Sequence, residues 1–328
     1  MDPRIGLQFQ QDGFVHLRDV FSAEEIARFR EAVLKEADRG TETGQRLKSV
    51  SGETVPCRDV ASVPGLEGVV FDQRLVRVAQ LLLGVQKPVY FGDSSVMVGG
   101  AQRGFHKDSS NRDDPSHSDW QSPYGLVRMG IYLQDHSNHS GGLRLRVGSH
   151  LHADVTTGRS YAVPTRPGDV VVWNLRTTHS GHAVRIRGMK SLPLQPRVEF
   201  RLPQPLRTGE EKLRAAIFMT YGANGCHLET YLRKHTDTST YPENYLLRAW
   251  EHSNGGESMI SRAEQAGVEF RRPILTYGQH YGDKRYPEGY VPNRSSVADV
   301  YPAKGLEAAI QLAGKAWRMA ERILRRQS

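Results

Sequence analysis

Gly168-Asp169-Val170-Val171-Val172-Trp173, followed by Leu175 and then His179, gives the clearest indication of the fold. A Gly-Asp turn followed by an apolar run rich in β-branched residues is typical of a buried strand. His179 follows this strand directly, so a rigid element holds its backbone. The stretch therefore indicates a β-sheet protein that places a histidine at the end of a core strand.

A second stretch, Gly104-Phe105-His106-Lys107-Asp108-Ser109, carries a candidate pair of metal ligands. Side chains two positions apart in an extended strand point to the same face, so His106 and Asp108 can bind one ion together. A second histidine from a later strand would complete a set of two imidazoles and one carboxylate. Such a set is the facial triad of non-haem Fe(II) oxygenases, which leaves coordination positions open for other ligands. An iron-dependent oxygenase is therefore the leading functional hypothesis.

The chain contains four His-x-Asp pairs, and their context separates them. The pairs are His106/Asp108, His117/Asp119, His152/Asp154 and His235/Asp237. Only the first follows a strand-like run and has a hydrophobic strand with a histidine downstream. The others fall in polar loops, in a turn or at a helix end, where His and Asp commonly serve local hydrogen bonding. For the third ligand, His179 and His182 compete, and His179 is preferred because it directly follows the core strand.

Sequence periodicity predicts helices at the N-terminus and many short strands after them. Ser22-Ala-Glu-Glu25 forms a capping box, and apolar residues then recur at helical spacing until Gly40. A second helix is expected over 74–83, ended by Gly84. Strands are expected at 13–18, 88–98, 126–134, 143–147, 169–175 and 215–221. This pattern predicts a mainly β chain with flanking helices, arranged as an antiparallel sandwich or barrel of the jelly-roll type.

The sequence changes character beyond Gly222. Helices are expected over 227–235, 243–252 and 304–326, with Tyr-, Pro- and Gly-rich connections between them. We therefore expect a β domain with N-terminal helices over 1–222 and a helical C-terminal extension over 223–328 that packs on it.

Composition narrows the functional classes. The 328 residues are 38% hydrophobic, which is enough to bury a substantial core. No window approaches the length of a membrane span, so a soluble cytoplasmic protein without a membrane partner is expected. The two cysteines, Cys57 and Cys226, exclude a disulfide framework and a thiolate zinc site. The net charge of +8 lacks a basic run interleaved with aromatics, which argues against nucleic-acid binding. Nothing in the sequence sets an oligomeric state.

From about residue 9 to residue 221 the chain resembles the phytanoyl-CoA dioxygenase-like (PhyH) family of Fe(II)/2-oxoglutarate-dependent oxygenases. The matching stretches occur in the family's order: Asp12-Gly13-Phe14-Val15 leading into the Ser22 helix, His106-x-Asp108, Ser140-Gly141-Gly142-Leu143 followed by Val147-Gly148-Ser149-His150, and Pro167-Gly168-Asp169-Val170 leading to His179-Ser180-Gly181. The resemblance implies a double-stranded β-helix core (jelly-roll, cupin-like) that holds Fe(II) through His106, Asp108 and His179. It also implies 2-oxoglutarate as co-substrate, O2 as oxidant, and hydroxylation of an unactivated C–H bond with release of CO2 and succinate.

The resemblance further implies an arginine that pairs with the far carboxylate of 2-oxoglutarate. Arg214 fits, because it precedes the hydrophobic strand at 215–221, and Ser180 is a candidate hydrogen-bonding neighbour. The family usually has about a dozen residues between the distal histidine and this arginine, whereas 214 − 179 = 35 positions separate them here. Arg185 and Arg187 are therefore alternatives.

The substrate is less well marked than the co-substrate. A polar loop over 109–124 follows the metal pair, and the candidate substrate residues in or beside it are Lys107, Arg112, Trp120 and Tyr124. Together with Arg128, the basic residues indicate a small, anionic metabolite or a natural-product intermediate. The alternatives are a catalytically inactive jelly-roll protein that binds a ligand or carbohydrate, and a nucleic-acid demethylase on the same scaffold.

Overall fold

The structure is a computed structural model. It describes residues 4–42, 46–48, 54–56, 60–99, 104–109, 114–120, 123–188, 202–236 and 256–271, together with residues 312 and 316. The helices are α1 (Arg4–Asp12), α2 (Ala23–Glu42), α3 (Gln73–Leu83), α5 (Cys226–Thr236) and α7 (Gly256–Gln265). The strands are β1 (Phe14–Leu17), β2 (Arg46–Lys48), β3 (Thr54–Pro56), β4 (Val89–Val98), β5 (Leu126–Tyr132), β6 (Gly142–Val147), β7 (Arg159–Ala162), β8 (Val170–Asn174), β9 (His179–Ala183), β10 (Ala215–Gly222) and β11 (Glu269–Phe270).

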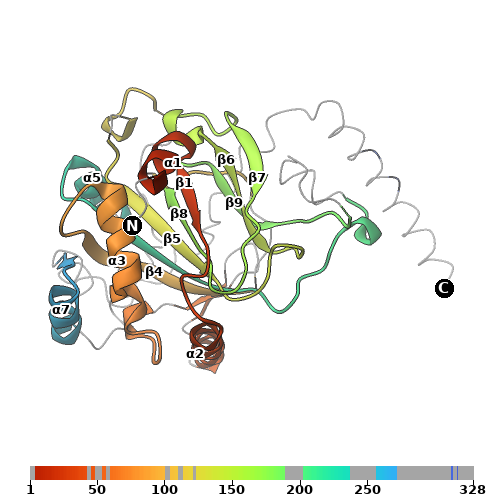
Figure 1. Cartoon of the computed structure of the whole chain (residues 1–328), viewed down its shortest axis with the longest axis horizontal. Coiled ribbons are helices and arrows are strands. Elements are labelled where there is room, and N and C mark those ends of the chain that lie inside the picture. Colours follow the sequence, from red (N-terminus) through yellow and green to blue (C-terminus); the bar gives the residue numbers. More distant parts are fainter. Residues whose placement is uncertain are drawn as a thin grey trace, which may run out of the picture.

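Two antiparallel sheets lie against each other (Figure 1). The large sheet has the order β1-β8-β5-β10-β4-β3-β2, with β11 added to β4, and the small sheet has the order β7-β6-β9. The chain alternates between them, from β5 to the small sheet, back to β8, across to β9 and back to β10. This alternation is the double-stranded β-helix, so the predicted fold class is confirmed. Each strand expected from the period of two is present within a few residues.

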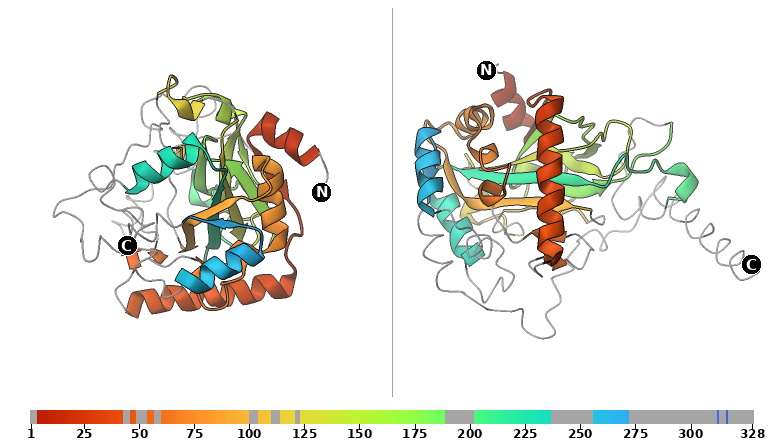
Figure 2. Two further views of the ribbon diagram at one scale, coloured as in Figure 1. Left: turned by 90° about the vertical axis from the view of Figure 1, so that its left-hand side faces the viewer. Right: turned by 90° about the horizontal axis from the view of Figure 1, so that it is seen from below.

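Helices cover the outer face of the large sheet, as Figure 2 shows for α2. α2 packs on β4 and β10, and α3 packs on β5. The capping box is formed: the Ser22 amide donates to Glu25 Oε2 at 2.8 Å, and the Glu25 amide donates to Ser22 Oγ at 3.3 Å. The larger hydrophobic cluster lies between these helices and the sheet, and a smaller one joins inward-facing residues of both sheets.

The Gly168-Asp169 turn fastens β8 to the N-terminal segment. Gly168 has a φ of +99°, and a Cβ there would lie 2.4 Å from the Phe21 carbonyl oxygen. Only glycine therefore allows the two backbone segments to lie this close. In this arrangement the Gly168 carbonyl accepts hydrogen bonds from the Val20 and Phe21 amides. Asp169 is buried, and its carboxylate accepts from the Asp19 amide and pairs with His16 at 2.8 Å.

The long interval before Arg214 is an excursion from the sheet. Ile186 and Arg207 form an antiparallel bridge, the Arg187 amide donates to the Leu206 carbonyl, and the Thr208 amide donates to the Arg185 carbonyl. The chain thus leaves after β9 and returns along its own outgoing arm before β10 begins. This pairing explains how 35 positions separate a distal histidine from an arginine that starts the neighbouring core strand.

Segments beyond Gly222 join the main core. α5 matches the helix expected over 227–235, whereas the helices expected over 243–252 and 304–326 fall almost entirely outside the described residues. β11, which the sequence did not predict, pairs in parallel with β4. Residues of the large hydrophobic cluster that come from this part of the chain are Leu228, Tyr231, Leu232, Ala263, Val268 and Phe270. The division of the chain at 222/223 stays a prediction.

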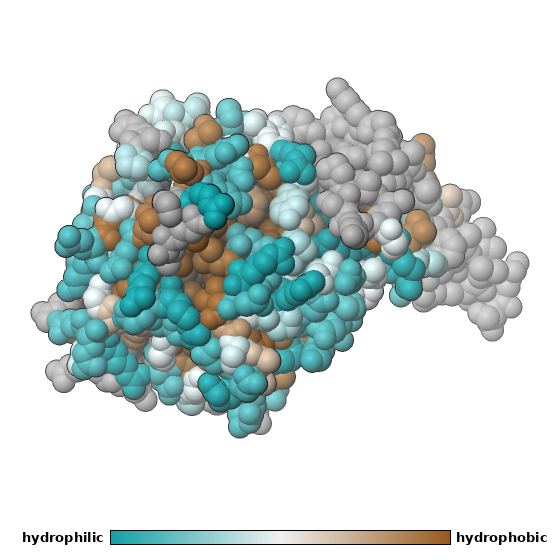
Figure 3. Space-filling model, in the orientation of Figure 1, coloured by the Kyte–Doolittle hydropathy of each residue, from teal (hydrophilic) through white to brown (hydrophobic). Residues whose placement is uncertain are grey.

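Hydrophilic side chains cover most of the face seen in Figure 3, with hydrophobic residues visible between them. Among the described residues, no helix combines the length and the apolar character that crossing a membrane requires.

Candidate metal and co-substrate site

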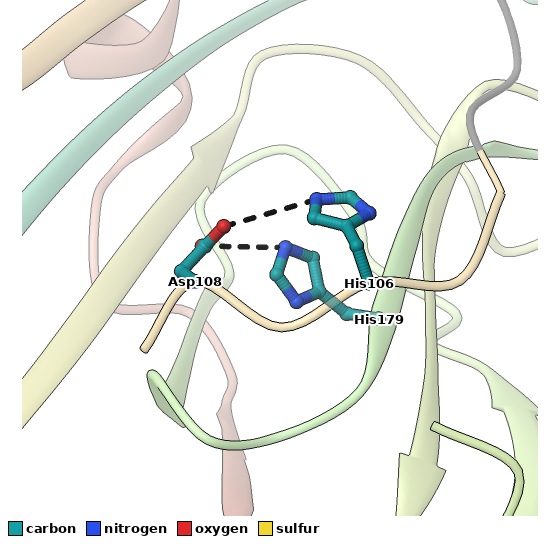
Figure 4. Close-up of side chains that lie close together, drawn as sticks. All are labelled: His106, Asp108 and His179. Atoms are coloured by element: carbon teal, nitrogen blue, oxygen red, sulfur yellow. Dashed lines mark ion pairs between the residues drawn. The ribbon is translucent and has the colours of Figure 1, made fainter. Parts of the chain in front are cut away.

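Three of the predicted residues meet at one point between the sheets (Figure 4). Potential ligand atoms of His106, Asp108 and His179 all lie within 4.8 Å of one another. Asp108 Oδ1 is 3.8 Å from His106 Nε2, and Asp108 Oδ2 is 3.4 Å from His179 Nε2. In the part of the chain that the structure describes, this is the one group of three or more such residues with that spacing.

Backbone carbonyls orient both imidazoles of the cluster. His106 Nδ1 lies 2.9 Å from the Gly104 carbonyl oxygen, and His179 Nδ1 lies 3.1 Å from that of Thr177. An Nδ1–H donated to a carbonyl leaves the Nε2 lone pair for a metal, which is the usual outer-shell arrangement of metal-binding histidines. Burial lowers the pKa of His179, which favours the neutral ring that binds metal.

The donor set fits a non-haem iron centre. Two imidazoles and one carboxylate are the ligand set of the facial triad. Here His179 comes from β9, and His106 and Asp108 come from a segment that bridges to His179. Within the described residues, neither His117/Asp119 nor His152/Asp154 lies near a third potential ligand. The His235 side chain and Asp237 lie outside the described residues. The His182 side chain also falls outside the described residues, so the preference for His179 over His182 stays a prediction.

Arg128 binds the Asp108 carboxylate, a contact that the sequence analysis did not predict. Its Nη1 donates to Asp108 Oδ2 at 2.8 Å and its Nη2 donates to Asp93 Oδ2 at 2.7 Å. Because two carboxylates already bind the Arg128 guanidinium, its interpretation as part of an anionic-substrate site is not supported. No local pattern links positions 93, 108 and 128, so only the fold reveals the contact.

Arg214 lies at the start of β10, facing the strand that carries His179. Its Nε donates to the Gly141 carbonyl at 2.8 Å and its Nη1 donates to the Gly99 carbonyl at 3.1 Å. A Cβ on Gly181 would lie 3.7 Å from its Nη2, so this nitrogen faces the strand two residues beyond His179. Arg214 is 2% exposed. The guanidinium is thus held on the same face of β9 as the His179 imidazole.

The two alternative arginines face elsewhere. Arg187 is exposed, and Arg185 Nη2 donates to the Ala162 carbonyl of β7 at 3.3 Å. Both belong to the outgoing arm of the excursion after β9. Arg214 is therefore the arginine whose geometry suits the far carboxylate of 2-oxoglutarate.

Two buried polar atoms face the space between the sheets without a hydrogen-bond partner in the described structure. They are Tyr132 Oη and Trp173 Nε1, on side chains that are 0% and 1% exposed. The Trp173 ring lies 5.5 Å from that of His179, and both Tyr132 and Trp173 make edge contacts with Phe218. Buried donors are normally satisfied, so their lack of partners indicates a polar ligand between them. A dicarboxylate reaching from the triad to Arg214 fits this arrangement.

The structure argues against direct roles for Ser180 and Lys107. Strand alternation puts Ser180 on the opposite face of β9 from His179, and its hydroxyl donates to the Gly181 carbonyl at 3.2 Å. The Lys107 side chain likewise points away from those of His106 and Asp108, and it is 1% exposed. Its ammonium donates to the carbonyls of Ser149 and Arg176, each at 2.7 Å. Burial lowers the pKa of Lys107 to about 7.

Trp120 and Tyr124 flank a cation that the sequence did not single out. The Arg176 guanidinium lies 4.9 Å from the centre of the Tyr124 ring and 5.5 Å from that of Trp120. The carbonyl of the neighbouring Leu175 accepts a hydrogen bond from the Asp108 amide at 3.0 Å. Arg176 and the two rings therefore lie beside the group of His106, Asp108 and His179. Tyr124 Oη and Arg176 Nε are buried and have no hydrogen-bond partner in the described structure. Arg112 lies outside the described residues.

The family model described as phytanoyl-CoA dioxygenase (PhyH) matches residues 9–190, which is more than half of the chain. The chain belongs to the phytanoyl-CoA dioxygenase family. The matched range contains the whole cluster and ends before Arg214, so the arginine is supported by the fold and not by the family match.

Ectoine dioxygenase from Stutzerimonas stutzeri (strain A1501) is 28% identical to this family member over 156 residues, covering 44% of this chain and 49% of that protein. The match thus spans about half of that relative's length. Similar solved structures include EctD from S. alaskensis with 2-oxoglutarate and 5-hydroxyectoine, at 19% identity and a TM-score of 0.47 over 68% of this chain and 76% of that chain. The non-heme alpha ketoglutarate dependent epimerase SnoN from nogalamycin biosynthesis is 19% identical with a TM-score of 0.48, over 67% and 82% of the two chains.

Proposed function

We propose that this protein is an Fe(II)/2-oxoglutarate-dependent dioxygenase. The observation that carries the proposal is the cluster of His106, Asp108 and His179, with both imidazoles turned to present Nε2. Family membership supports the same activity. The chemistry supplied by such a centre is oxidation of an unactivated C–H bond by O2, with 2-oxoglutarate converted to succinate and CO2.

The chain's own residues define where each partner would lie. His106, Asp108 and His179 would bind the metal, which would also bind 2-oxoglutarate. Arg214 would receive the far carboxylate through its planar guanidinium, which suits bidentate pairing. The Tyr132 hydroxyl and the Trp173 indole N–H would donate along the length of the molecule, which satisfies two otherwise unpartnered buried atoms.

The substrate is proposed to be a small molecule with an anionic group. Arg176, Tyr124 and Trp120 support this proposal, because an arginine 3% exposed has a buried Nε without a hydrogen-bond partner in the described structure. An anion that accepts from Arg176 Nε and Tyr124 Oη would satisfy both atoms. Hydroxylation is the reaction class proposed, since Asp108 supplies the carboxylate that related halogenases lack.

The test is mass spectrometry of metabolite extracts enriched in small carboxylates and phosphates. Extracts are incubated with the protein, Fe(II), 2-oxoglutarate and O2, and compounds that gain one oxygen are sought together with succinate. His179→Ala serves as the matched control. A binding protein without catalytic activity would deplete no metabolite and form no succinate above the control.

A further inference from the structure

A chain of contacts leads from α5 to the metal-binding carboxylate. Tyr231 Oη donates to Asp93 Oδ2 at 2.9 Å, and Arg128 Nη2 donates to the same carboxylate oxygen at 2.7 Å. Arg128 Nη1 then donates to Asp108 Oδ2 at 2.8 Å. Its Nε is held by Thr220 Oγ1 at 3.0 Å, so the guanidinium is fixed on three sides. The participants come from α5, β4, β5 and β10 and are buried or nearly so.

The net charge of the contacts that join Asp93, Arg128 and Asp108 favours binding of a divalent cation. Within these contacts Asp93 and Asp108 each carry −1 and Arg128 carries +1, which sums to −1. If Asp93 were neutral, Arg128 would cancel the charge of Asp108 and the cluster would offer a metal no net negative charge. Little solvent reaches this group, so screening is weak: Asp93 is 3% exposed and the Arg128 side chain is 15% exposed.

The contacts also fix the orientation of the ligand. Asp108 Oδ2, the oxygen nearer to His179 Nε2, accepts from Arg128, which holds the carboxylate in one rotamer facing both imidazoles. Arg128 in turn keeps its position because Asp93 and Thr220 bind its other nitrogens. Tyr231 anchors Asp93, so a residue beyond Gly222 contributes to the orientation of a metal ligand.

We propose that Arg128 is a positioning residue for Asp108, and that Asp93, held by Tyr231, sets the charge that Asp108 presents to the metal. The inference rests on the proposed metal site. It adds a requirement that the triad alone does not contain: a second buried carboxylate, which makes no contact with the metal, is needed for metal affinity.

The test is calorimetric titration of the full-length metal-free protein with Mn(II) as a redox-inert substitute for Fe(II). Asp93→Asn should weaken Mn(II) binding by about tenfold to a hundredfold, the range usual for outer-shell partners. Tyr231→Phe should weaken it less, because Asp93 keeps its contact with Arg128. Loss of affinity alone would also follow from a disturbed fold, so a second variant separates charge from structure.

Asp93→Asn combined with Arg128→Gln removes one negative and one positive charge and restores the net charge of −1. This double variant should recover part of the Mn(II) affinity lost in Asp93→Asn, because the net charge returns while the contact that positions Asp108 does not. A double variant that binds Mn(II) no better than Asp93→Asn would overturn the charge assignment.

Matched controls are Asp169→Asn, a buried carboxylate paired with His16 on another part of the sheet, and Tyr221→Phe, a buried hydroxyl bonded to the Val70 carbonyl. Both should lower the melting temperature and leave Mn(II) affinity unchanged. If the unmodified protein binds no Mn(II), the proposed metal site itself fails. If it binds Mn(II) and Asp93→Asn binds equally well, only the further inference fails.

Discussion

His106 and His179 form a reciprocal pair of backbone hydrogen bonds: the His106 amide donates to the His179 carbonyl at 3.0 Å, and the His179 amide donates to the His106 carbonyl at 2.8 Å. Such an exchange is the hydrogen-bonded pair of an antiparallel ladder. It places the two imidazoles side by side, with ring centres 4.4 Å apart. The positions of two proposed metal ligands are therefore set by backbone pairing.

Arg214→Ala should weaken binding of 2-oxoglutarate by about two to three and a half decades, since leaving a buried carboxylate unpaired costs about 3 to 5 kcal/mol. Arg214→Lys should recover part of the loss, because an ammonium cannot reproduce the planar fork. Calorimetric titration of Mn(II)-loaded protein measures the effect. Arg187→Ala, which removes an exposed arginine, is the control, and a comparable loss there would move the anchor into the excursion after β9.

Tyr132→Phe should change stability and co-substrate binding in opposite directions. Removing a buried hydroxyl without a partner should raise the free energy of unfolding of the ligand-free protein by about 1 kcal/mol or more. The same change should weaken 2-oxoglutarate binding roughly tenfold, because a hydrogen bond to a charged group is lost. Denaturant unfolding and calorimetry measure the two effects. Tyr221→Phe is the control, and it should lower stability without affecting 2-oxoglutarate.

Stability should fall as the pH drops from about 6.5 towards 4, in part because of His136. Burial lowers the pKa of His136 to about 4, whereas the unfolded chain takes up the proton near pH 6.5. The unfolded state thus binds more protons in this window, and about 3 kcal/mol of stability is present above it and lost across it. Urea unfolding at pH 4 to 7 measures this slope. His136→Gln should show a shallower slope; an unchanged slope would mean that the imidazole is not held neutral.

Gly168→Ala should destabilise the fold by about 2 kcal/mol or more, because it combines a left-handed backbone with a clash against the Phe21 carbonyl. Gly209→Ala is the control, since a Cβ there meets nothing within 4 Å. Denaturant unfolding compares the two. Equal stability of both variants would contradict the role given to the Gly168 turn.

The fold and the triad were predicted from local sequence patterns: apolar runs, helix caps and the spacing of His and Asp. Strands β4, β5, β8 and β10 have clear apolar runs, and α2 and α3 have caps and helical spacing. His106 and Asp108 were identified because a spacing of two in extended backbone gives a shared face. The structure brings them together although their segment forms only an isolated bridge to His179 and no strand. The sequence analysis did not predict α1, a nine-residue helix in which Phe9 is buried and Ile5 packs against the core.

Residues that act through distant contacts were not predictable. Arg128 meets Asp93 and Asp108 across 35 and 20 positions, and no periodicity encodes those separations. The two-residue strand β11 pairs with β4 from about 180 positions away. The roles predicted for Lys107 and Ser180 rested on their proximity in sequence to His106 and His179. In the structure the Lys107 side chain bonds to the carbonyls of Ser149 and Arg176, and the Ser180 hydroxyl bonds to the Gly181 carbonyl.

Anaerobic calorimetric titration of the protein with 2-oxoglutarate, with and without Fe(II), tests whether His106, Asp108 and His179 form the iron site. We expect tight binding only when Fe(II) is present, and no metal-dependent binding in His179→Ala, although that variant should keep its fold because the site lies on a preformed scaffold. Binding of 2-oxoglutarate that is equally strong without metal, or that survives in folded His179→Ala, would contradict the assignment of His106, Asp108 and His179 as the iron site.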